Sequence, residues 1–138
     1  MRYILFISLL IMIPVANAVG ERIKLVSDFA PEQTLERFIT ALEDKGIAIL
    51  DEDGGLASGH VIKFANPLLG ENIGMCGKGL RKDEPMQATI WKDENGTTWL
   101  SYETPREIVN SFGVIECGHE TDNLRKTLKG FAALATEH

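Results

Sequence analysis

Two cysteines, Cys76 and Cys117, are the residues of this sequence best suited to covalent chemistry. An even number of cysteines in an exported chain favours a disulfide. In the chain-entropy model, a disulfide that closes the long loop from Cys76 to Cys117 stabilises the fold by roughly 4 kcal/mol. We therefore predict a disulfide that ties the glycine-rich segment around Cys76 to the start of the last helix.

Soft metal ligands near the cysteines allow a second interpretation. Met75 precedes Cys76, His119 follows Cys117 by two residues, and His60 is a further imidazole. Thioether, thiolate and imidazole groups together suit copper or haem iron. The haem-attachment pattern C-x-x-C-H is absent, however, and two cysteines are too few for a structural zinc site. A redox-active thiol pair is a third alternative, which the absence of C-x-x-C disfavours. The sequence favours the disulfide and predicts no cofactor.

The remaining polar clusters do not form a recognisable active site. Residues 70–79 lack the G-x-x-x-x-G-K-[ST] pattern of a phosphate-binding loop. The acidic run 51–53 is typical of a solvated turn rather than of an acid–base pair. Because no nucleophile and base share a motif, we assign no catalytic residue, and the sequence disfavours an enzyme.

The first 18 residues have the pattern of a secretory signal peptide. Arg2 precedes an apolar run over residues 3–15, and Ala16-Asn17-Ala18 forms a small-x-small cleavage site. We expect cleavage after Ala18 and a periplasmic or secreted protein, with an uncleaved membrane anchor as the alternative. The apolar run is shorter than the ~20 residues that span a bilayer, and no second such run follows, so the mature chain has no predicted membrane span.

The length of the remaining chain, residues 19–138, fits a single domain. The formal net charge of the whole sequence is −6. This acidic balance disfavours nucleic acid and anionic membrane surfaces as partners, because both repel a negatively charged protein at long range.

The pattern of apolar residues predicts an α+β domain. A helical stripe of Leu35, Phe38, Ile39 and Leu42 lies between Pro31 and Gly46. Alternating or short apolar runs predict strands over residues 22–27, 47–50 and 60–65, with a turn over residues 51–55. Further predicted elements are a short helix within 68–84, a β-hairpin over 86–102, a short helix from about 104 to 112 and a last helix from about Asp122. We expect two layers, with one mixed or antiparallel sheet of about five strands covered by helices.

The hairpin contains both tryptophans, Trp91 and Trp99, on either side of Asn95-Gly96. Asn-Gly favours a two-residue type I′ turn. With that turn, Trp99 shares a face with Ala88 and Ile90, and Trp91 shares the other face with Leu100 and Tyr102.

Neither face of this predicted hairpin is polar, so the hairpin is either covered on both sides or leaves one face to a partner. The candidate binding surface comprises Trp91, Trp99, Leu100 and Tyr102. The partners that fit it are a small apolar ligand or a second copy of the chain in a homodimer.

The hairpin also carries a family resemblance. Asn66-Pro67, Pro85 and the run Trp91-x-Asp93-x-x-Gly96-x-x-Trp99-Leu100-Ser101-Tyr102-x-x-Pro105 resemble the family known as domain of unknown function 302. The resemblance implies a small α+β domain with a sheet packed on helices, often dimeric, and implies no activity. The shorter link over residues 54–59 and the two cysteines depart from the family pattern, so any role of the cysteines is specific to this chain.

Overall fold

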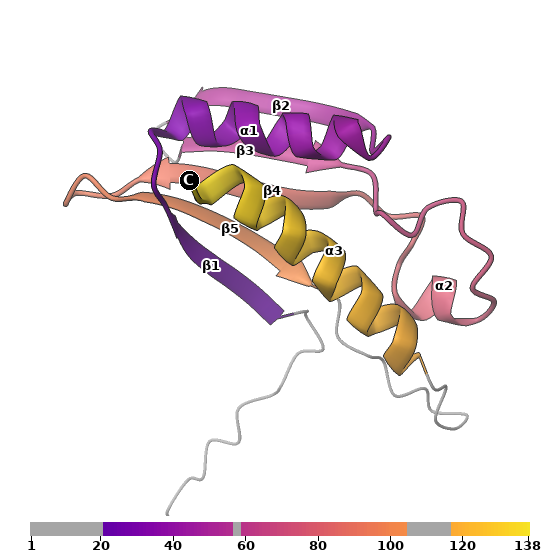
Figure 1. Cartoon of the computed structure of the whole chain (residues 1–138). Helices are drawn as coiled ribbons and strands as arrows, with labels where there is room; N and C mark the ends of the chain where they lie inside the picture. Colours follow the sequence, from indigo (N-terminus) through magenta and orange to yellow (C-terminus); the bar gives the residue numbers. More distant parts are fainter. Residues whose placement is uncertain (1–20, 57–58, 105–116) are drawn as a thin grey trace, which may run out of the picture.

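The computed structural model of this chain describes residues 21–56, 59–104 and 117–138 (Figure 1). Its strands are β1 (Glu21–Ser27), β2 (Ile49–Leu56), β3 (Gly59–Phe64), β4 (Met86–Lys92) and β5 (Thr98–Thr104). Its helices are α1 (Pro31–Asp44), α2 (Cys76–Gly79) and α3 (Gly118–Thr136). The strands form one sheet in the order β1-β5-β4-β3-β2, and all four neighbouring pairs are antiparallel. The predicted two-layer α+β fold is confirmed.

Helices α1 and α3 lie on the same side of the sheet, and α2 lies beyond one end of the sheet (Figure 1). Helix α1 packs on β2, β3, β4 and β5, whereas α3 packs mainly on β5 and β1. The predicted stripe of α1 packs inward, with Phe38 and Leu42 almost completely buried. Phe38 meets Phe64 of β3 edge to face, with ring centroids 5.6 Å apart. Burial of these apolar faces is the main stabilising contribution to a fold of this size.

A buried hydroxyl pair joins the first strand to the first helix. The Ser27 and Thr34 hydroxyl oxygens are 2.6 Å apart, and the Thr34 hydroxyl also donates to the carbonyl of Ala30 at 2.9 Å. Pro31 occupies the first turn of α1, where its missing N–H is not needed by the helix. These contacts fix the direction in which α1 crosses the sheet.

Asn66 holds the long connection between β3 and β4. Its buried side-chain amide donates to the carbonyls of Leu80 and Arg81, both at 3.3 Å, and its Oδ1 accepts from the N–H of Leu68 at 2.9 Å. A buried amide with both ends satisfied fixes the surrounding loop. Asn66, one of the residues on which the family resemblance rests, therefore has a structural role.

The second strand differs from its prediction. Residues 51–55, expected to form a turn, lie within β2, where Asp51, Glu52 and Asp53 pair with Lys63, Ile62 and Val61 of β3. The acidic residues and glycines are typical of a turn, but β2 is an edge strand, and register irregularities lie on both sides of its paired residues 51–53. Charged residues are common on edge strands because they discourage pairing with other sheets.

The helices also differ in part from their predictions. Helix α3 begins at Gly118, four residues before the expected start at Asp122. The short helix expected after the hairpin, over residues 104–112, lies outside the described residues except for Thr104, which ends β5. Within the described part of the chain, no helix is both long and apolar enough to cross a membrane.

Candidate binding face

The hairpin loop spans residues 93–97 and is longer than predicted, because Lys92 pairs with Thr98. Asp93 organises this loop: its Oδ1 accepts from the backbone N–H groups of Asn95 and Thr97, each at 2.9 Å. A type I′ turn needs a positive φ at both central residues, but only Gly96, with a φ of 80°, has one. The prediction of a two-residue type I′ turn was therefore wrong. The aspartate side chain competes with the local turn preference of Asn-Gly by satisfying two backbone donors.

This longer loop changes the faces of the hairpin. Trp91 is the register partner of Trp99, and Ile90 is the partner of Leu100. A change of one residue in register moves side chains to the opposite face. Consequently Leu100 and Tyr102 point into the core, where they are almost fully buried, and the prediction that they share a face with Trp91 was wrong. Burial raises the pKa of the Tyr102 hydroxyl.

The face of the sheet opposite α1 and α3 is covered by no helix or strand of the described residues (Figure 1). We call it the open face. Trp91 and Trp99 lie side by side on it, both partly buried, and the next position across the sheet is Val26, whose exposed fraction is 54%. The open face therefore carries an apolar row at the hairpin end of the central strands.

Lys24 lies over this apolar row. Its Nζ is 4.2 Å from the ring centroid of Trp99 and 5.4 Å from that of Trp91. Both distances are within the range in which a cation is attracted to the face of an aromatic ring. The ammonium group thus adds a positive charge to an aromatic platform.

The orientation of Trp99 is fixed by the loop. Its indole Nε1–H donates to Oδ2 of Asp93 at 2.8 Å. This hydrogen bond is the main reason that the pKa of Asp93 is lowered, and the backbone N–H of Thr97 contributes in the same direction. The carboxylate therefore remains ionised and holds the ring of Trp99 in one position.

The close approach of β3 to Trp91 requires a glycine at position 59. It has a φ of +98°, and a Cβ placed there would lie 2.3 Å from the carbonyl oxygen of Ile90 and 2.7 Å from Cβ of Trp91. Only glycine fits both the backbone conformation and this close approach. The sequence interpretation missed Lys24, Val26 and Gly59 as members of this face, because strand pairing rather than local spacing brings them to the tryptophans.

The sulfur residues form a separate feature. Cys76 and Cys117 form a disulfide with a Cα–Cα distance of 5.6 Å, which connects α2 to the residue before α3. Both cysteines are buried, whereas Met75 is 69% exposed. His119 lies on the first turn of α3, with Nε2 3.3 Å from Nδ2 of Asn123.

His60 is not part of that group. It lies near the start of β3, on the helix-covered face, with Nε2 3.8 Å from the Glu32 carboxylate of α1. In the described residues no three His, Cys, Asp or Glu side chains are grouped closely enough to hold a metal ion. The disulfide leaves neither sulfur as a thiolate, which is the form that binds soft metals.

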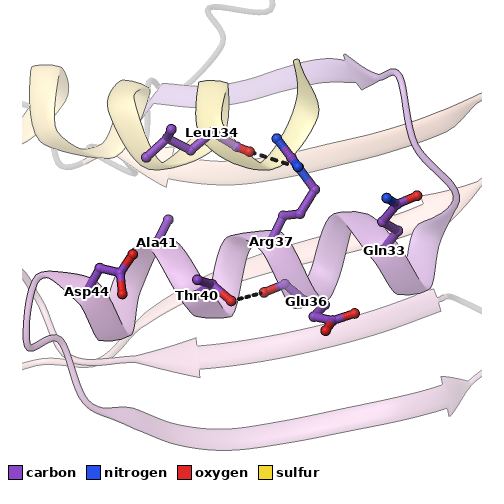
Figure 2. A pocket seen from close by; sticks show the side chains of 7 residues that line it. All are labelled: Gln33, Glu36, Arg37, Thr40, Ala41, Asp44 and Leu134. Carbon is purple, nitrogen blue, oxygen red and sulfur yellow. Dashed lines mark hydrogen bonds between the residues drawn. The ribbon is translucent and has the colours of Figure 1, made fainter. Parts of the chain in front are cut away.

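A shallow groove of about 390 Å³ lies on the outer side of the helix layer (Figure 2). Its lining is mostly polar and comes from α1, with Leu134 contributed by α3. Arg37 bridges the two helices: its Nε donates to the carbonyl of Leu134 at 3.1 Å and its Nη2 to that of Glu137 at 3.0 Å. Because these bonds satisfy carbonyls at the end of α3, Arg37 has a structural role in joining the helices.

The sequence matches no protein-family model and no curated protein. Among solved structures, the chain is similar to the crystal structure of an uncharacterized conserved protein DUF302 from Bacillus stearothermophilus, with 12% sequence identity and a TM-score of 0.47. The match covers 83% of this chain and 94% of the other. This similarity says nothing about the activity, ligand or assembly of the chain.

Proposed function

We propose that this protein is an exported binding module whose open face takes a small apolar ligand or a protein partner. One observation carries the proposal: Trp91 and Trp99 lie side by side, partly buried, on a sheet face that no described element covers, with Lys24 above them. Large aromatic side chains combine a wide apolar contact area with low conformational entropy, which suits them to binding surfaces.

Export is the second part of the proposal, and two observations support it. The first 18 residues follow the signal-peptide pattern. The only two cysteines form a disulfide, a bond that persists in the periplasm and outside the cell and is rare in the cytosol. The alternative, a redox or metal- or haem-binding envelope protein using Cys76, Cys117 and His119, requires reduction of that disulfide before either thiolate exists.

The binding surface is tested with anilinonaphthalene sulfonate, an apolar dye whose sulfonate complements Lys24. We expect the dye to bind at low protein concentration and to quench tryptophan emission by energy transfer. Trp99→Ser should weaken dye binding by about tenfold, because it removes half of the aromatic platform. The matched control is Leu134→Ser, which removes an apolar side chain of 59% exposure from α3 and should leave dye binding unchanged. Equal dye binding by the two variants contradicts the proposal.

A further inference from the structure

The open face carries charges of opposite sign on its two edges. The edge strand β1 contributes Arg22 and Lys24, and the other edge strand, β2, contributes Asp51 and Asp53, all four exposed. The central strand β4 contributes no charged side chain between its ends on this face. The face therefore has a basic edge and an acidic edge with a neutral strand midway between them.

Strand pairing places these side chains in rows that cross the sheet. One row, from β1 to β2, consists of Arg22, Glu103, Gln87, Lys63 and Asp51. Gln87 and Glu103 are placed side by side in it by extending the β4–β5 register one residue beyond Ala88 and Tyr102. The next row consists of Lys24, Ser101, Thr89, Val61 and Asp53. In both rows, positions at equal distance from β4 are either oppositely charged or uncharged. The order of charges from β2 to β1 is thus the order from β1 to β2 with each sign inverted.

This pattern is complementary to itself. When two open faces meet around a twofold axis that runs along β4, Lys24 lies opposite Asp53 of the second copy and Arg22 lies opposite its Asp51. Glu103 likewise lies opposite Lys63 of the second copy. A twofold axis perpendicular to the strands would instead place β1 opposite β1 of the second copy, so that Lys24 would face the positive charges of the same strand. Facing like charges are unfavourable, so the charge pattern selects the axis along β4.

We propose that the partner of the open face is a second copy of this chain, with the two sheets packed face to face around an axis along β4. This inference rests on the proposed function, because it names the partner of the same face. Two sheets packed in this way keep their strands roughly aligned, which the antiparallel sheets of β-sandwich proteins also do.

The apolar row fits the same arrangement. Trp91 of β4 lies at the axis and meets its own copy. Trp99 lies opposite Gly59 of the second copy, which carries no side chain that could meet the indole ring. The arrangement therefore covers the aromatic surface that no described helix or strand covers, and surrounds it with charged pairs.

The size of the face predicts a weak dimer. Five strands about 4.8 Å apart and three same-side residues about 6.8 Å apart along each strand cover on the order of 500 Å² per chain. Two such faces reach roughly 1,000 Å², the lower limit of a specific interface. We expect a dissociation constant on the order of 10 µM at low ionic strength, rising with salt because the peripheral pairs are exposed.

Sedimentation velocity of the protein purified from the envelope of the cells that produce it tests the inference over protein concentrations from micromolar to millimolar. Lys24→Asp and Asp53→Lys each replace two attractive contacts by repulsive ones, so each variant alone should dimerise at least about tenfold more weakly. An equimolar mixture of the two variants should associate again, because each chain then offers the charge that the other lacks. The double variant carrying both changes should dimerise like the wild type.

Lys126→Asp is the matched control, since it makes the same charge change at an exposed position of α3 and should leave dimerisation unchanged. A wild-type chain that stays monomeric at millimolar concentration overturns the second copy as partner. A dimer that Lys24→Asp and Lys126→Asp weaken equally overturns the proposed arrangement. Dye binding that depends on Trp99 in a monomeric chain would leave the binding face in place, so failure of the partner and failure of the face are distinguishable.

Discussion

Trp99 donates its indole N–H to the Asp93 carboxylate, with Nε1 and Oδ2 2.8 Å apart. The other oxygen of the same carboxylate accepts two backbone N–H groups of the loop. One side chain therefore fixes both the path of the hairpin loop and the position of a ring on the open face.

Asp93→Asn should destabilise the protein at neutral pH, because an amide offers one acceptor oxygen where the carboxylate offers two. The pKa of Asp93 is lowered below 3.8 in the fold. A carboxylate with a lowered pKa stabilises the fold above its unfolded pKa, and this contribution is lost as the pH falls through the folded pKa. The difference between wild type and variant should thus shrink below about pH 3.8.

Urea unfolding at pH 7 and at pH 3, followed by tryptophan emission, measures this difference. The indole N–H resonance of Trp99 supplies an independent readout, since it should shift as Asp93 titrates. Asp122→Asn, at an exposed position of α3, is the control for loss of one negative charge. The same stability difference at both pH values would contradict the role of the Asp93 charge.

The hairpin also shows how far the sequence predicts the fold. Alternation of apolar residues located both strands, and Asn95-Gly96 located the connection between them. The faces could not be derived, because they depend on whether the loop has an even or an odd number of residues. That number is decided by the hydrogen bonds that the Asp93 carboxylate accepts, whose geometry is not visible in local residue preferences.

Gly59→Ala should destabilise the fold by about 1–3 kcal/mol or more, because the new Cβ meets the Ile90 carbonyl and Trp91 at a positive φ. Gly46→Ala is the matched control. Gly46 also has a positive φ, +71°, but no atom lies within 4 Å of the added Cβ. It should therefore show only the backbone cost, about 1 kcal/mol. Chemical unfolding of both variants separates the two effects, and equal losses would show that close approach to Trp91 does not matter.

The helices and the core were more accessible to prediction than the candidate site. The apolar stripe of α1 repeats with helical spacing, and its members Leu35, Phe38 and Leu42 are buried as expected. The open face has no such local pattern: Lys24 and Trp99 are far apart in the sequence and meet only because β1 pairs with β5. A site whose residues are brought together by strand pairing therefore cannot be predicted from the spacing of residues along the sequence alone.

The predicted export has a direct measurement. Protein recovered from the envelope of the producing cells should begin at Val19, because Ala18 ends the small-x-small cleavage site. Ala18→Leu should block processing, since signal peptidase requires a small residue there, and the precursor should stay with the membrane. Mass spectrometry of the intact protein distinguishes the two products. A chain that retains Met1 in the soluble fraction would contradict the signal peptide.

The structural role of the disulfide is tested by removing both cysteines. Cys76 and Cys117 are buried and connect α2 to the start of α3, with 41 residues of sequence separation. The double variant Cys76→Ala/Cys117→Ala should lose about 2–5 kcal/mol of unfolding free energy, because the unfolded chain is no longer constrained. If the bond is structural, dye binding to the open face of the folded double variant should equal that of the wild type. Loss of dye binding at full folding, or a bound metal or haem detected in the absorption spectrum of the native protein, would instead favour the soft-ligand alternative.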